Sequence, residues 1–163
     1  MTQRLDYQTA APHILRPLFE AGKALSESSL EPALQTCVLI RASQINGCAF
    51  CLALHVREAQ ALGESGDRVN GLAAWRDAPW YSERERAALE CTETLTRISA
   101  HHPDDALYER VKKHFSDREM AELSFVIASI TTWNMLNVGF RTDPTRAEEV
   151  FERLHPNAAA ATN

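Results

Sequence analysis

The sequence predicts an all-α domain, and three observations support this prediction. Apolar residues recur at helical spacing through most of the 163-residue chain, and the alternating pattern of strands is nearly absent. Two helix starts, Ser82 with Glu85 and Ser116 with Glu119, match the capping-box pattern. Hydrophobic residues make up 45% and charged residues 24%, which are ordinary values for a globular protein. This length fits one domain.

Four helices are expected in the first half of the chain, at about residues 12–26, 32–46, 48–62 and 65–74. The first carries apolar residues at helical spacing. Ser28 or Ser29 can cap the second, which has Pro32 in its first turn. Gly47 ends that helix, because glycine tolerates the left-handed conformation common at helix C-termini. Gly63 ends the third in the same way, and a tryptophan-containing loop follows the fourth.

Four more helices are expected at about residues 82–98, 103–115, 116–137 and 143–154. The two capping boxes open the first and third of these, and a proline near the start opens each of the other two. The tail, residues 156–163, is expected to be disordered. A single domain is therefore predicted over residues 1–155.

Charge and hydropathy argue against two classes of partner. Lys and Arg total 17 against 22 for Asp and Glu, and no basic block occurs, so nucleic acid is not expected. The N-terminus lacks the pattern of a signal peptide. The uncharged run over residues 123–140 contains seven Ser, Thr, Asn and Gly residues, too many for a lipid-facing span. We expect a helix buried in protein on most sides, no membrane partner and a cytoplasmic location.

The four cysteines fall into two groups. Cys37 and Cys91 lie in apolar helical patterns and are expected to be small core residues. Cys48 and Cys51 form a C-x-x-C pair. Without a secretory signal, these cysteines do not suggest a framework of structural disulfides. In a reducing compartment, the C-x-x-C pair instead indicates redox chemistry or a metal site.

Cys48, Cys51 and His55 share one narrow face of the expected helix, at about 0°, 300° and 340° for ~100° per residue. Because Gly47 breaks the preceding helix, Cys48 is expected in a first turn, where free backbone N–H groups and the helix dipole favour a thiolate. His55, one turn after Cys51, is near enough to accept or relay its proton. One sulfur would attack an oxidant or a disulfide, and the other would then close an intramolecular disulfide.

A zinc site is the alternative chemical interpretation of this motif. The motif would supply three ligands, with Cys37, Cys91, His101 or His102 as the fourth. Structural zinc usually draws its ligands from two separated pairs, and the sequence contains no second C-x-x-C. We therefore expect no metal and no other cofactor.

At this motif the sequence resembles the alkylhydroperoxidase D-like (AhpD-like) branch of the carboxymuconolactone decarboxylase family. The similarity is carried by residues 43–51 (SQINGCAFC) and His55, and it continues through Gly63-Glu64, Trp75-Arg76, residues 82–89 and Thr132-Trp133-Asn134. The resemblance implies an all-α homo-oligomer, commonly a trimer or hexamer. It also implies a thiol-dependent hydroperoxide reductase without metal or haem. We expect a thioredoxin-like or lipoyl dithiol donor to regenerate it.

Carried over by residue, the resemblance implies that Cys51 is the peroxidatic cysteine, Cys48 the resolving cysteine and His55 the relay histidine. Helix-end electrostatics alone would favour Cys48 as the attacking thiolate, but only Cys51 has His55 one turn away. Relatives usually carry a glutamate twelve positions before the first cysteine, and this chain has Thr36 there. Threonine cannot act as a base near neutral pH, so a water or another carboxylate would have to complete the proton relay.

Two further functions are open alternatives to the predicted peroxidase. One is a disulfide reductase or redox sensor of the same fold, for which peroxide is not the main substrate. The other is a non-catalytic oligomeric binding protein that keeps the motif but has lost its relay at Thr36.

Overall fold

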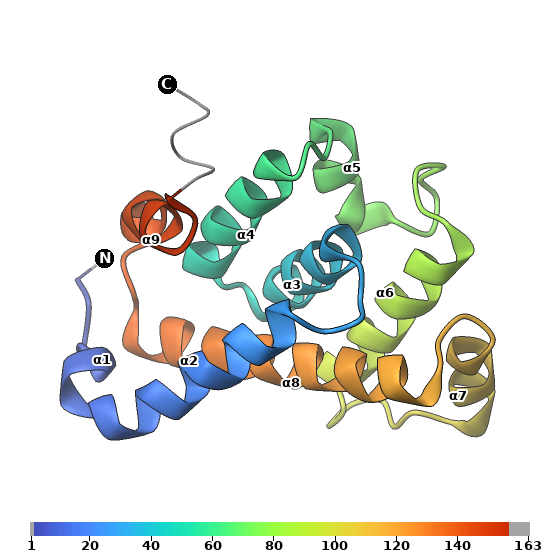
Figure 1. Cartoon of the computed structure of the whole chain (residues 1–163), viewed down its shortest axis with the longest axis horizontal. Helices are drawn as coiled ribbons and strands as arrows, with labels where there is room; N and C mark the ends of the chain where they lie inside the picture. Colours follow the sequence, from blue (N-terminus) through green and yellow to red (C-terminus); the bar gives the residue numbers. More distant parts are fainter. Residues whose placement is uncertain (1, 157–163) are drawn as a thin grey trace.

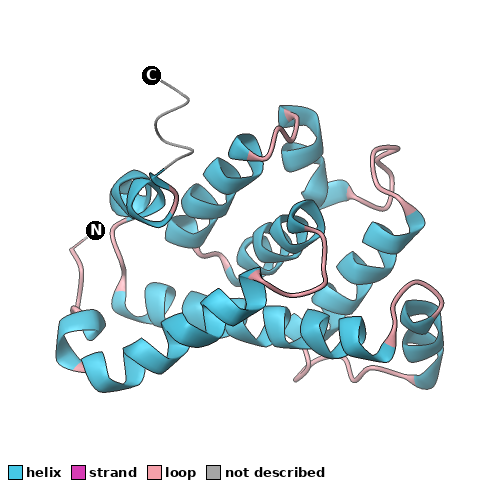
Figure 2. Ribbon diagram, viewed as in Figure 1, coloured by secondary structure: helices cyan, strands magenta, loops and turns pink. Residues whose placement is uncertain are grey.

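The computed structural model describes residues 2–156. The elements in chain order are α1 (Tyr7–Ala10), α2 (Pro12–Ser26), α3 (Pro32–Asn46), α4 (Ala49–Ala61), α5 (Gly66–Gly71), η1 (Leu72–Ala74), α6 (Glu83–Thr96), α7 (Asp105–Lys112), α8 (Asp117–Phe140), η2 (Pro144–Arg146) and α9 (Ala147–Leu154). Residues 2–156 contain no strand, so the predicted all-α class is confirmed (Figure 2). Of the tail predicted to be disordered, residues 157–163 lie outside the described part of the chain.

Local sequence signals account for several helix ends. Ser82 and Glu85 form a complete capping box at the start of α6, and Ser116 and Glu119 form another at the start of α8. Gly47 follows α3 with a φ of 65°, in the left-handed region that glycine occupies without strain. These features confirm the predicted starts of two helices and the break before the C-x-x-C motif.

The predicted cap of α3 is wrong. The N-cap is Glu31, whose side chain makes no capping hydrogen bond. The backbone N–H of Ser29 instead donates to the carboxylate of Glu122 on α8, at 3.0 Å. Ser28 accepts a hydrogen bond from the Gln35 amide at 3.2 Å. Both serines therefore bind side chains and not the free backbone N–H groups at the start of α3, and one of these side chains comes from a distant helix.

Helix α3 lies at the centre of the molecule, with α4, α6 and α8 packed around it (Figure 1). Its buried residues fall on every side of the helix, as expected for an element surrounded by others: Leu34, Gln35, Thr36, Cys37, Val38, Ile40, Ala42 and Ser43. Helix α4 begins directly after the turn that ends α3 and packs between α3 and α9. The start of α4 is therefore enclosed by α3 and by the C-terminal part of the chain.

Helix α8 is more exposed than predicted. Phe125 and Met135 are 66% and 70% exposed. In the most apolar stretch of 18 residues of this helix, 33% of the stretch is buried. The expectation of a helix buried on most sides is therefore wrong for the single chain, because the other elements cover one face of α8. Among residues 2–156 it is the one helix long and apolar enough to cross a membrane, a criterion that core helices also meet. Its covered face carries the buried amides Asn134 and Asn137.

Candidate active site

The two cysteines of the motif meet at the N-terminus of α4. Cys48 is the N-cap and Cys51 lies in the first turn, and the two form a disulfide with their Cα atoms 5.3 Å apart. The backbone N–H of Cys51 donates to Cys48 Sγ at 3.2 Å. The left-handed Gly47 turns the chain, so that the N–H of Cys48 donates to the carbonyl of Ser43 at 3.0 Å. Local geometry thus assembles the predicted sulfur pair.

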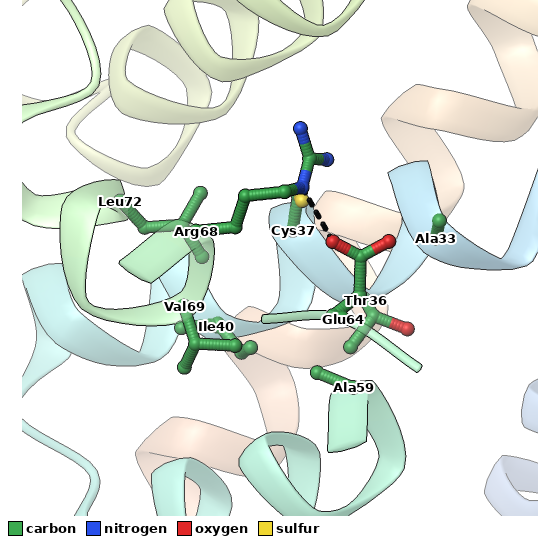
Figure 3. A pocket seen from close by; sticks show the side chains of 9 residues that line it. All are labelled: Ala33, Thr36, Cys37, Ile40, Ala59, Glu64, Arg68, Val69 and Leu72. Atoms are coloured by element: carbon green, nitrogen blue, oxygen red, sulfur yellow. Dashed lines mark hydrogen bonds and ion pairs between the residues drawn. The ribbon is translucent and has the colours of Figure 1, made fainter. Parts of the chain in front are cut away.

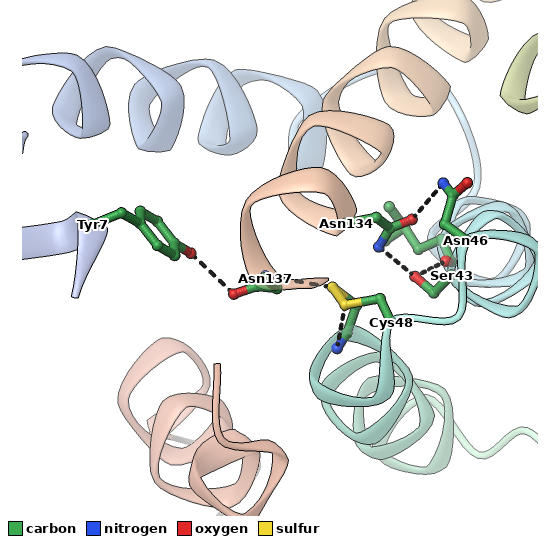
Figure 4. The surroundings of a disulfide bond; sticks show 8 residues. Tyr7, Ser43, Asn46, Cys48, Asn134 and Asn137 are labelled. Carbon is green, nitrogen blue, oxygen red and sulfur yellow. Dashed lines mark hydrogen bonds between the residues drawn. A yellow bond between two sulfur atoms is a disulfide. The ribbon is translucent and has the colours of Figure 1, made fainter. Parts of the chain in front are cut away.

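Two residues that the sequence analysis missed complete the surroundings of Cys51 (Figure 4). The side-chain amide of Asn137, on α8, donates to Cys51 Sγ at 3.5 Å. Tyr7 Oη, on α1, donates to Asn137 Oδ1 at 3.0 Å and so orients the amide. An N–H aimed at sulfur stabilises the thiolate when the pair is reduced. Asn137 could have been noticed in the sequence as a polar residue within an apolar helix, because a buried polar side chain needs a hydrogen-bond partner.

A second amide on α8 holds the turn before the motif. Asn134 is fully buried, and its Nδ2 donates to Ser43 Oγ at 3.1 Å. Its Oδ1 accepts a hydrogen bond from Asn46 Nδ2 at 3.0 Å. Asn134 therefore binds the last turns of α3 and fixes the segment that leads into Cys48 (Figure 4).

We expect Asn137→Ala to slow the reaction of reduced Cys51 with iodoacetamide by about 10-fold. A hydrogen bond to a charged group contributes about 1.5 kcal/mol, and its loss leaves the thiolate less stabilised. The rate is measured by mass mapping of peptides after timed alkylation. Thr132→Ala is the matched control on α8, since Thr132 is exposed and its hydroxyl donates to the carbonyl of Ala128. Equal rates for the Asn137 variant and the wild type would reject the thiolate-stabilising role.

His55 lies one turn after Cys51, as the motif requires, and its side chain is 12% exposed. Its Nδ1 lies 2.7 Å from Glu58 Oε2. Glu58 Oε1 in turn lies 2.9 Å from Nε2 of His155, the residue that follows α9. Among the hydrogen bonds of the described residues, His55 makes none to either sulfur, so its relay role stays a prediction.

Thr36 and the nearby carboxylate of Glu64 each have a polar partner of their own. Thr36 is buried on α3 and donates to the carbonyl of Pro32 at 2.8 Å, within its own helix. It lines a small cavity of about 10 Å³ with Cys37 and Glu64, and Glu64 is paired there with Arg68 (Figure 3). A cavity of this size holds one water at most. The cavity therefore offers no unpaired carboxylate beside Thr36.

The other two cysteines are poor nucleophiles. Burial, with a smaller contribution from Glu85, raises the pKa of Cys37 to about 12. Burial and Glu90 raise the pKa of Cys91 to about 11. Both thiols stay protonated at neutral pH, and the thiolate is the reactive form. Within residues 2–156, no three His, Cys, Asp or Glu side chains are grouped as metal ligands.

Comparison with known proteins identifies the family of the chain. Residues 12–94 match the model of the carboxymuconolactone decarboxylase family. The uncharacterized protein YdfG of Bacillus subtilis is 35% identical over 138 residues, which cover 85% of this chain and 94% of YdfG. A crystal structure of a protein from Agrobacterium tumefaciens superposes with a TM-score of 0.85. That protein is described as of unknown function and as a candidate antioxidant defence protein AhpD. That protein is 35% identical, and the match covers 87% of this chain and 97% of the other.

A more distant structure has the same fold. The AhpD core of an uncharacterized peroxidase-related protein from Ralstonia eutropha has a TM-score of 0.74 at 20% identity, covering 90% of this chain and 77% of the other. The family match spans half of this chain, and YdfG is related over nearly its whole length. The chain therefore belongs to the carboxymuconolactone decarboxylase family, in its AhpD-like branch.

Proposed function

We propose that the protein is a thiol-dependent hydroperoxide reductase that uses Cys51, Cys48 and His55. The observation that carries the proposal is the Cys48–Cys51 disulfide at the start of α4, in an AhpD-like fold. A helix N-terminus lowers the pKa of a nearby thiol, and a second thiol three residues away closes a disulfide without moving the backbone far. No metal or other cofactor is needed for this chemistry.

In the proposed cycle, His55 takes the proton of the Cys51 thiol, and the resulting thiolate attacks the terminal oxygen of the hydroperoxide O–O bond. The bond breaks, Cys51 becomes a sulfenic acid, and the departing alkoxide takes a proton from His55 and leaves as an alcohol. The Cys48 thiol then attacks the sulfenic sulfur, so that an S–S bond forms and water leaves. A thioredoxin-like or lipoyl dithiol donor reduces the disulfide by exchange and is itself oxidised. Each turnover reduces one hydroperoxide to an alcohol and water.

The surroundings of the sulfurs support Cys51 as the attacking residue. Its Sγ receives the Asn137 amide from α8, and His55 follows it by one turn on the same helix. The Sγ of Cys48 receives the backbone N–H of Cys51, which holds it in the N-cap position. Cys51 therefore has both a hydrogen-bond donor from another helix and a nearby imidazole.

The environment of the pair favours a small, apolar substrate. Cys48 and Cys51 are 1% and 2% exposed, and they share a core cluster with the apolar residues Ala42, Phe50, Leu54, Ile130 and Ala147. A small organic hydroperoxide needs less opening to reach a buried sulfur than a disulfide on a folded protein does. The burial therefore favours a small hydroperoxide in the oxidising step and a small dithiol such as a lipoyl group in the reducing step.

The test uses reduced protein mixed with one equivalent of cumene hydroperoxide, followed by thiol trapping and peptide mass mapping. We expect rapid formation of the Cys48–Cys51 disulfide, while Cys37 and Cys91 stay reduced because burial raises the pKa of each thiol. A parallel sample receives oxidised glutathione in place of the peroxide. Faster reaction with the disulfide than with the hydroperoxide would reject the proposal in favour of a disulfide reductase. Reaction with neither would favour a binding protein.

We also propose that the enzyme works as a homo-oligomer, a trimer or a hexamer. Apolar side chains on two neighbouring helices are exposed in the single chain, namely Ile14 and Phe19 on α2 and Phe125, Met135 and Val138 on α8. Exposed apolar patches of this kind mark association surfaces. Sedimentation velocity should give a mass of three or six chains, and a monomer would contradict the proposal.

A further inference from the structure

Glu58 is a largely buried carboxylate that the proposed cycle leaves without a role. It lies on α4, one turn after His55, and its side chain is 18% exposed. Its two oxygens face two imidazoles, His55 Nδ1 at 2.7 Å and His155 Nε2 at 2.9 Å. A buried carboxylate is costly unless hydrogen bonds satisfy it, and these two contacts do so.

The protonation of Glu58 determines the tautomer of His55. Burial favours the neutral acid, but the hydrogen bonds from His55 and His155 overcome this and keep the pKa of Glu58 below its ordinary value. Glu58 is therefore ionised at neutral pH, and an ionised carboxylate can only accept hydrogen bonds. It follows that the Nδ1–H of His55 and the Nε2–H of His155 are the donors. The Nε2 of His55 is then left as the nitrogen that accepts or returns a proton.

We propose that Glu58 is the positioning carboxylate for His55. It supplies the carboxylate of the proton relay, which Thr36 cannot supply. This inference rests on the proposed hydroperoxide reductase function. Glu58 holds the imidazole ring in one orientation with its proton on Nδ1. It also stabilises the imidazolium that forms when Nε2 takes up a proton, as second-sphere carboxylates do for other histidines.

The C-terminal helix takes part in this arrangement. The ring centroid of His155 lies 5.1 Å from that of Phe151 on α9, and Phe151 packs against the core cluster that contains the disulfide. The contact between α4 and α9 also includes an ion pair, Arg57 with Glu148, at 3.7 Å. No titratable side chain of α3, α5, α8 or η2 bonds to Glu58 within the described residues. The carboxylate is thus shared between the two imidazoles alone, one from each side of the α4–α9 contact.

The kinetic test compares Glu58→Gln and Glu58→Asp with the wild type. The rate of Cys48–Cys51 disulfide formation with cumene hydroperoxide is followed across pH 5–9. We expect Glu58→Gln to be slower by about 10-fold to 100-fold near neutral pH, because the charge that supports the imidazolium is lost. Glu58→Asp, which keeps the charge, should recover part of the rate. Glu148→Gln is the matched control, since Glu148 lies at the same helix contact without touching His55, and it should stay within about 2-fold.

A second measurement does not depend on peroxide activity. Nitrogen-15 NMR of reduced protein reports which ring nitrogen of His55 carries the proton. We expect the Nδ1–H tautomer in the wild type and a shift toward Nε2–H in Glu58→Ala. An unchanged tautomer, or an unchanged rate profile in Glu58→Gln, would overturn the positioning role. If the wild type fails to react with hydroperoxide, the proposed function fails, and the NMR result still decides whether Glu58 positions His55.

Discussion

Cys51→Ser is expected to lower hydroperoxide turnover by about 10³-fold or more. A serine hydroxyl is not ionised near neutral pH and cannot replace the thiolate nucleophile. The loss of hydroperoxide is measured with dithiothreitol as the reductant. Cys91→Ser is the matched control and should keep the wild-type rate, because burial, with Glu90, raises the pKa of that thiol to about 11. Full activity in Cys51→Ser would remove Cys51 from the proposed cycle.

Cys48→Ser distinguishes the two possible orders of attack. If Cys51 attacks first, this variant still reacts with one equivalent of hydroperoxide and accumulates a sulfenic acid at Cys51, because no resolving thiol remains. Dimedone labels that sulfenic acid, and mass mapping identifies the residue. If Cys48 attacks first, the label appears instead on Cys48 of the Cys51→Ser variant. That outcome would favour the order expected from helix-end electrostatics alone.

Leu89→Ala is expected to lower the free energy of unfolding by about 4 kcal/mol. Leu89 is fully buried on α6 and shares a core cluster with Ile40 of α3 and with Tyr81. Its truncation removes apolar contacts and leaves a cavity between the central helix and its neighbour. Urea unfolding followed by circular dichroism measures the change. Leu62→Ala, at a position that is 49% exposed, should cost less than about 1 kcal/mol. Similar losses in both variants would contradict the assigned core.

Much of the fold was predictable because its signals are local. Capping boxes and the left-handed glycine act within four or five residues, so they mark the starts of α6 and α8 and the end of α3. Helix α1 was missed because its four residues, Tyr7–Ala10, are too few to show a periodicity. The cap of α3 was wrong because Glu122, 93 residues away, binds Ser29. Such competition between local and distant partners is decided by packing.

The exposure of α8 also could not be read from its composition. An apolar, uncharged run predicts burial, but it does not specify which neighbours supply the cover. In the single chain one face of α8 packs inward with Asn134 and Asn137, while Phe125 and Met135 remain exposed. The proposed association of several chains would bury that outer face.

The sequence by itself determined the helical class and the C-x-x-C motif, because Cys48, Cys51 and His55 lie within about two turns of one helix. Tertiary structure alone decided what surrounds them. Asn137, 86 residues from Cys51, supplies the amide on its sulfur, and His155, 97 residues from Glu58, shares that carboxylate. Helical periodicity relates residues three or four positions apart. Contacts across such separations depend on how whole helices pack, which no local pattern encodes.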